Sequence, residues 1–171
     1  MRTVVFGIGD VERGDDSAGW LVADLVANGR PDVEVAYVSA DPTSLLGDPR
    51  WATAQHAVVV DAVITGAEPG TVHEWAADDL VGPVSTTLGD DHDLGVATTL
   101  TLAHALGRLP SDVTVVGIEA GHGHRGSPPS HAVLAAAERV AATLCMLVPP
   151  AHRRDRRGQG DRVTSAHRQR G

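Results

Sequence analysis

Short strand-like runs alternate along this chain with segments in which apolar residues recur every three or four positions. Strand patterns occur at residues 3–6, 33–38, 56–60, 71–75 and 113–118, and helical stripes occur at residues 18–26, 94–109 and 133–148. A helix between two strands favours parallel pairing, because it carries the chain back across one face of the sheet. The alternation therefore predicts an α/β fold with a twisted, mostly parallel five-stranded sheet and helices on both faces.

The composition changes abruptly at Pro149-Pro150. The segment 149–171 holds seven of the fourteen Arg residues and almost no large apolar side chains. Such a segment cannot bury enough apolar surface to offset the entropy lost on ordering. We therefore predict one folded domain over residues 1–148, which suits the usual domain length, and a disordered Arg-rich tail over residues 149–171.

Charge and composition exclude several classes of partner. Residues 1–148 carry seven Arg against twenty acidic residues, and the chain has no Lys. An acidic body argues against nucleic acid, whose binding depends on cationic contacts to phosphates, but it permits binding of a metal cation. The N-terminus lacks the apolar region of a signal peptide, no apolar run is long enough to span a membrane, and Cys145 is the single cysteine. We expect a cytoplasmic monomer with no membrane partner.

Polar residues stand where three of the predicted elements begin or end. The first strand leads into a turn containing Asp15 and Asp16, the apolar run 57–60 leads to Asp61, and His92 precedes the helical stripe that starts at residue 94. Open α/β sheets bind ligands at the carboxyl ends of their strands. Two carboxylates and one imidazole gathered there would suit nickel, zinc or iron and would leave coordination positions open.

Each of these residues also has a plainer interpretation. Asp15 or Asp16 could cap the following helix, which would account for one of the two acids. Asp61 could be a hydrogen-bonded loop anchor, since a buried carboxylate is costly without partners. His92 could belong to a solvated acidic turn.

The first turn also contains a fragment of a dinucleotide-binding pattern, Gly7-Ile8-Gly9. The sixth position of that pattern, however, is occupied by Glu12 instead of glycine, and the acids that follow would repel a pyrophosphate. A nucleotide-binding α/β module is therefore the weaker alternative. It predicts nucleotide binding without a metal.

Four segments in order resemble the motifs of the hydrogenase maturation endopeptidases over roughly residues 1–147. They are Gly7-Ile8-Gly9-Asp10 with Arg13-Gly14-Asp15-Asp16, Val58-Val59-Val60-Asp61-Ala62, His92-Asp93-Leu94-Gly95, and Val116-Gly117-Ile118-Glu119. The resemblance implies a phosphorylase/hydrolase-like fold. It also implies a hydrolase that removes the C-terminal extension of a nickel-loaded [NiFe]-hydrogenase large-subunit precursor, its partner.

By position, the resemblance implies that Asp16, Asp61 and His92 are the metal ligands and the catalytic residues. The metal would be nickel presented by the precursor, with zinc or cadmium as substitutes in vitro. Two routes of attack stay open: a metal-polarised water or carbonyl, and a carboxylate acting as general base. A nickel-dependent checkpoint protein that binds the precursor without cutting it would retain the same three residues.

Two positions depart from the family pattern. Asp10 stands where the family usually has Asn, and the turn Ser39-Ala40-Asp41-Pro42 lacks the two glycines of the family's Asp-Gly-Gly-Thr type turn. We expect that turn to lie near the substrate groove, so the departure bears on substrate choice.

Overall fold

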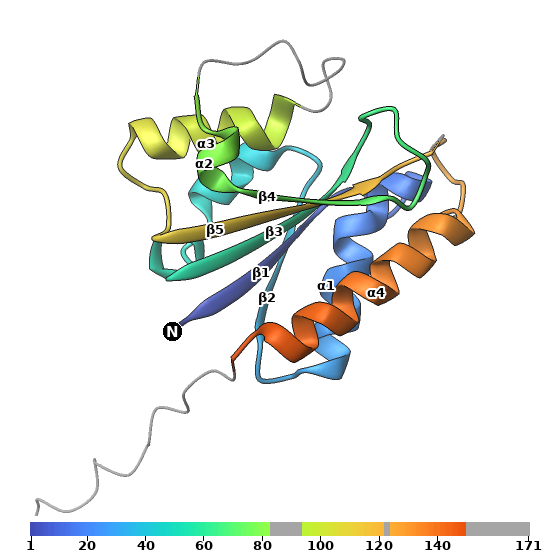
Figure 1. Cartoon of the computed structure of the whole chain (residues 1–171), viewed down its shortest axis with the longest axis horizontal. Coiled ribbons are helices and arrows are strands. Elements are labelled where there is room, and N and C mark those ends of the chain that lie inside the picture. Colours follow the sequence, from blue (N-terminus) through green and yellow to red (C-terminus); the bar gives the residue numbers. More distant parts are fainter. Residues whose placement is uncertain (83–93, 122–123, 150–171) are drawn as a thin grey trace, which may run out of the picture.

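The computed structural model describes residues 1–82, 94–121 and 124–149 (Figure 1). Within them, five strands form one sheet in the order β2-β1-β3-β5-β4: β1 (Thr3–Ile8), β2 (Glu34–Val38), β3 (His56–Val63), β4 (Val72–Ala76) and β5 (Asp112–Glu119). β1, β2, β3 and β5 are mutually parallel, and only the edge strand β4 runs antiparallel, against β5. The predicted α/β fold with a mostly parallel sheet is confirmed.

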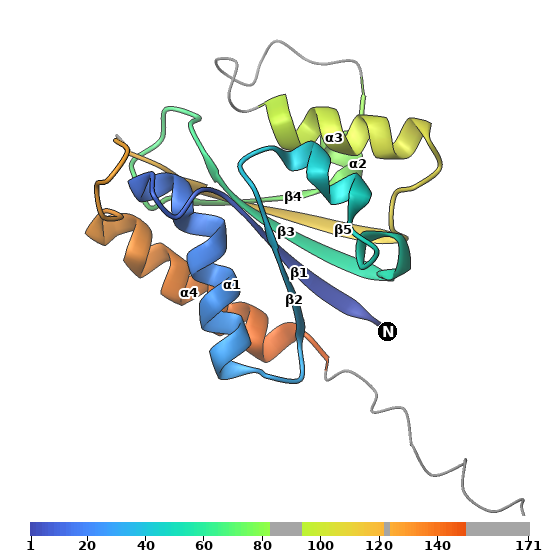
Figure 2. The ribbon, with the colours of Figure 1, turned by 180° about the vertical axis from the view of Figure 1, so that it is seen from behind.

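Helices cover both faces of this sheet, as Figures 1 and 2 show from opposite sides. One face carries α1 (Ala18–Gly29) and α4 (His131–Leu147), which pack side by side. The other face carries α3 (Leu94–Ala105), the one-turn helix α2 (Ala77–Leu80) and the 3-10 segments η2 (Pro42–Gly47) and η3 (Trp51–Thr53). A further 3-10 turn, η1 (Gly14–Ser17), precedes α1. No helix among the described residues is long and apolar enough to cross a membrane.

The core has two halves because successive side chains of a strand point to opposite faces. Phe6 and Val59 face the α3 side, where Trp51 is fully buried and meets the Phe6 ring edge-on at a centroid distance of 5.5 Å. Val5 and Val58 face the α1–α4 side. The central strands are therefore apolar at nearly every position, as the sequence pattern predicted.

Helix α1 lies against the sheet backbone to backbone. A Cβ atom at Gly7 would stand 2.2 Å from the carbonyl oxygen of Gly19, and a Cβ at Gly19 would stand 2.3 Å from the carbonyl oxygens of Ile8 and Val60. This close approach shifts the buried stripe of the helix toward its small residues. Leu25, which the periodicity placed on the buried face, is 39% exposed, so that part of the prediction was wrong.

Several boundaries also differ from the sequence prediction. The helix predicted over residues 94–109 ends at Ala105. β3 does not end at Asp61 but continues to Val63, because β5 pairs with it as far as Val63 and Glu119. The segment between the predicted strand 71–75 and the helical stripe that starts at residue 94 contains helix α2, for which the sequence pattern gave no signal. The predicted tail, residues 149–171, lies outside the described residues except for Pro149.

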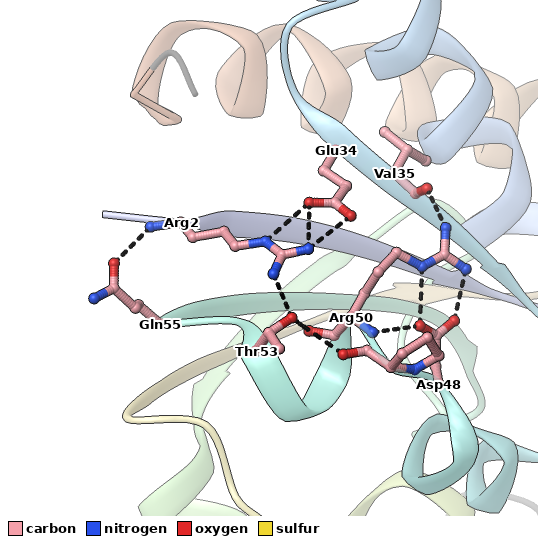
Figure 3. Close-up of polar contacts among 8 residues, drawn as sticks. Arg2, Glu34, Val35, Asp48, Arg50, Thr53 and Gln55 are labelled. Atoms are coloured by element: carbon pink, nitrogen blue, oxygen red, sulfur yellow. Dashed lines mark hydrogen bonds and ion pairs between the residues drawn. The ribbon is translucent and has the colours of Figure 1, made fainter. Parts of the chain in front are cut away.

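A polar network ties together the amino-terminal ends of the strands (Figure 3). The Arg2 guanidinium donates to the Glu34 carboxylate at 3.0 Å and also contacts the Thr53 hydroxyl. Nearby, Asp48 accepts from the backbone N–H of Arg50 at 2.8 Å and from its guanidinium at 2.6 Å. This network lies at the edge of the sheet opposite the carboxyl ends of the parallel strands.

Candidate active site

A cavity of about 510 Å³ opens at the carboxyl ends of β1, β3 and β5. It is lined by residues from the first turn, the segment after β2, the end of β3, the start of α3 and the segment after β5: Gly9, Arg13, Asp15, Asp16, Ala40, Asp41, Pro42, Asp61, Ala62, Ile64, Gly95, Ala120 and Gly121. Asp16 and Asp61, which are 45 positions apart in the sequence, thus share one cavity. The turn that departs from the family pattern, residues 39–42, also contributes to its wall.

The third predicted ligand, His92, lies outside the described residues. The described chain resumes at Leu94, and Gly95 lines the cavity. Within the described part of the chain, no three His, Cys, Asp or Glu side chains are grouped to hold a metal. Of the three predicted ligands, the structure therefore describes Asp16 and Asp61, which line one cavity, and the metal site itself stays a prediction.

The two adjacent acids of the first turn have different environments. Asp15 is 3% exposed, and its carboxylate accepts hydrogen bonds from the backbone N–H groups of Gly121 and Ser130. Asp16 is half-buried and lines the cavity. The prediction that one of them caps the helix was wrong, because the cap positions of η1 and α1 are Arg13 and Ser17 and neither side chain makes a cap hydrogen bond.

The glycines of the first turn hold the backbone around Asp16. Gly9 has a φ of +150°, and a Cβ there would stand 2.2 Å from the carbonyl oxygen of Asp16, which accepts from the Asp10 N–H at 3.3 Å. Gly14, at φ +58°, packs against Ser127. Packing and backbone conformation therefore account for these glycines without a bound pyrophosphate.

Asp61 lies in the last part of β3, between β1 and β5, and is half-buried. Its carboxylate accepts a hydrogen bond from the N–H of Ala62 at 2.8 Å. Asp41, which also lines the cavity, caps η2: the Thr43 hydroxyl and N–H donate to it, and these bonds lower the pKa of Asp41. Asp41 is thus committed to the local turn.

Glu119, which follows the apolar run of β5, was not singled out as a buried acid by the sequence reasoning. It is 1% exposed and accepts from the N–H groups of Thr65 and Gly66, the Thr65 hydroxyl and the His73 ring. Burial acts to raise the pKa of Glu119, but the hydrogen bonds from Thr65, Gly66 and His73 together outweigh it and hold the pKa below its usual value. The sequence signal that pointed to Asp61, a carboxylate directly after a buried apolar run, is also present at Glu119 and could have identified it.

Glu119 should make the stability of the protein depend on pH. Its folded pKa is lowered, so its contribution is present above the unfolded pKa of roughly 4.3 and is lost as the pH falls through the folded pKa. We expect Glu119→Gln to lower the free energy of unfolding by about 1–2 kcal/mol at pH 7, because charged hydrogen bonds become neutral ones. Urea unfolding at pH 7 and at a pH about one unit or more below the unfolded pKa checks this; a difference that does not shrink at the lower pH would contradict it.

Comparisons with known proteins agree with this architecture. The family model for hydrogenase maturation protease matches residues 33–146. The Hydrogenase 2 maturation protease of Escherichia coli K12 is 29% identical over 122 residues, which cover 69% of this chain and 73% of that protein.

Two solved structures from Thermococcus kodakarensis share the fold. The [NiFe] hydrogenase maturation protease HycI superimposes with a TM-score of 0.67 at 27% identity, covering 85% of this chain and 90% of that one. The maturation protease HybD superimposes with a TM-score of 0.70 at 21% identity, covering 87% of this chain and 100% of that one. Because the family model spans most of the folded domain, the resemblance seen in the motifs is confirmed, and the chain belongs to the hydrogenase maturation protease family.

Proposed function

We propose that this protein is the endopeptidase that removes the C-terminal extension of a nickel-loaded [NiFe]-hydrogenase large-subunit precursor. The observation that carries the proposal is that Asp16 and Asp61, from two separate motifs, line one cavity in a chain of the maturation protease family. Cavities of this volume bury a ligand of small-molecule size, so only a short peptide segment of the precursor enters. The precursor is the proposed partner, and the cytoplasm the proposed location.

The donor set fits a divalent metal brought by the substrate. Carboxylate oxygens and an imidazole nitrogen suit nickel and zinc, and three protein ligands leave positions for groups of the precursor. We propose that Asp16, Asp61 and His92 contact the nickel of the precursor, with zinc or cadmium as substitutes in vitro. Cleavage then depends on nickel because the ligands recognise the metal together with the peptide.

The metal supplies polarisation of a carbonyl or a water near the scissile bond. The alternative route is that the carboxylate of Asp16 or Asp61 accepts the proton of the attacking water as a general base. Arg13 also lines the cavity, where its positive charge would offset part of the negative charge of the acids. Either route would hydrolyse one bond in a presented segment.

The test of this function is the intact mass of the cognate large subunit from cells with the gene, without it, and with Asp16→Ala supplied in its place. We expect the extension to be retained in the second and third strains. Normal trimming of the large subunit without the gene, in cells shown to have no compensating protease, would contradict the proposed function. Purified protein that binds nickel-loaded precursor without changing its mass would instead identify a checkpoint protein.

His92 is expected to be required although it lies outside the described residues. Loss of one of three ligands should abolish recognition of the metal, while the fold should tolerate alanine because His92, flanked by Asp91 and Asp93, belongs to no apolar run of the sequence. His92→Ala should therefore keep the circular dichroism spectrum and melting temperature of the wild type but leave the precursor uncleaved in the same mass assay. Wild-type processing by this variant would exclude His92 from the site.

A further inference from the structure

We propose that Asp15 is a positioning residue, which sets the separation of the two ligands Asp16 and Asp61 by joining the segments on either side of β3. The inference rests on the proposed function, since it takes Asp16 and Asp61 as metal ligands. Asp15 is among the residues that line the cavity, but both of its carboxylate oxygens accept from backbone N–H groups, so the proposal gives it no contact with the metal or the peptide. Its effect passes through the backbone of the turn that carries Asp16.

The geometry of Asp15 supports this role. Its Oδ2 accepts from the N–H of Gly121 at 2.8 Å, and its Oδ1 accepts from the N–H of Ser130 at 2.6 Å. Both donors belong to the segment between β5 and α4, whereas Asp15 belongs to the turn between β1 and α1. In the sheet order, β3 lies between β1 and β5, and β3 carries Asp61. Asp15 thus bridges the two segments that flank the strand bearing the second ligand.

The other polar contacts recorded between the described residues of these two segments join exposed residues. The N–H of Gly126 donates to the carbonyl of Glu12 at 2.6 Å, and an exposed ion pair joins Arg125 to Glu12 at 3.3 Å. Exposed pairs contribute little because solvent screens them. Asp15 is the buried polar connection among these contacts, with each carboxylate oxygen engaged by a backbone amide.

The chemistry of the bridge requires a carboxylate. Two N–H donors from separate backbone positions need two acceptor oxygens, and an ionised Asp supplies both. Asn supplies one acceptor and one NH2 donor, so one backbone N–H would face another donor in a buried place. We therefore expect Asp15→Asn to break one of the two hydrogen bonds while preserving the size and shape of the side chain.

The first test measures binding of Zn²⁺ alone by calorimetry on the full chain. We expect Asp15→Asn to lower the melting temperature by about 5 °C and to raise the Kd for Zn²⁺ at least about tenfold. The matched control is Asp48→Asn, which also removes a carboxylate that accepts a backbone N–H, but at the opposite edge of the sheet. It should lower the melting temperature comparably and leave the Kd for Zn²⁺ unchanged.

The second test removes the donor of one of these hydrogen bonds and leaves the acceptor, Asp15, unchanged. Ser130 has a φ of −68°, which proline adopts, so Ser130→Pro removes the N–H that Asp15 accepts while leaving Asp15 in place. Ser130→Pro and Ser130→Ala both lose the Ser130 hydroxyl that caps α4, but only the proline variant loses the N–H. We expect Zn²⁺ to bind several-fold more weakly to Ser130→Pro than to Ser130→Ala.

The outcomes separate this inference from the proposed function. If Asp16→Ala loses Zn²⁺ binding while Asp15→Asn and Ser130→Pro match their controls, Asp15 is structural only and the inference is overturned. If Asp16→Ala binds Zn²⁺ like the wild type, the ligand assignment fails and the inference fails with it. The mass assay on the precursor then reports separately on whether the protein is a protease.

Discussion

Asp61→Asn is expected to leave the fold intact and to slow cleavage of the nickel-loaded precursor on the order of a thousandfold. The variant keeps an oxygen that can accept the N–H of Ala62, so β3 should be undisturbed. It loses the negative charge that the proposed metal contact needs, and metal contacts of this kind supply several kcal/mol of transition-state stabilisation. The rate is measured from the intact mass of purified precursor over time.

The control for this experiment is Asp112→Asn. Asp112 is an exposed acid at the amino end of β5, the strand adjacent to β3, and it lies away from the cavity. Its replacement removes the same charge without touching the site, so the cleavage rate should stay at the wild-type value. Equal cleavage rates for Asp61→Asn and the wild type would show that the Asp61 carboxylate takes no part in cleavage and would exclude it from the proposed ligands.

Gly7→Ala should lower the free energy of unfolding by about 3 kcal/mol or more, because the added methyl group has no space. Its Cβ would stand 2.2 Å from the carbonyl oxygen of Gly19 and 2.8 Å from the Cβ of Ala23. Backbone atoms cannot move aside as a flexible side chain can, so α1 would have to shift away from β1. The measurement is the urea midpoint of unfolding.

Gly47→Ala is the matched control, since nothing lies within 4 Å of a Cβ at that position. Its urea midpoint should stay close to that of the wild type. A Gly7→Ala midpoint equal to that of Gly47→Ala would show that α1 does not lie against the sheet as closely as described. The result also concerns the site, because the same helix begins two residues after Asp16.

Several features follow from local sequence patterns. The apolar runs predicted the strands, because a parallel sheet covered on both faces buries nearly every side chain of its central strands. Ser130 precedes the predicted helical stripe 133–148, and its side chain accepts from the N–H of Val133 as an N-terminal cap. Asp16 and Asp61 were predicted to lie together because the carboxyl ends of parallel strands meet at one edge, and they share the cavity. The roles of His92 and of the tail remain predictions.

Other features were decided only by the tertiary structure. Asp15 and Asp16 are neighbours of one type, and no local pattern shows that Asp15 binds amides 106 and 115 residues away while Asp16 faces the cavity. Gly7 and Gly19 are required to lack side chains only because the backbones of β1 and α1 meet there. Glu119 can be buried only because a loop more than fifty residues earlier in the sequence donates hydrogen bonds to it. Periodicity and polarity over a few residues specify which segments become strands and helices and which acids stand at their ends. Which acid is held by distant backbone amides and which lines the cavity depends on hydrogen bonds between segments that are far apart in the sequence. Those hydrogen bonds exist only once the sheet has brought the segments together.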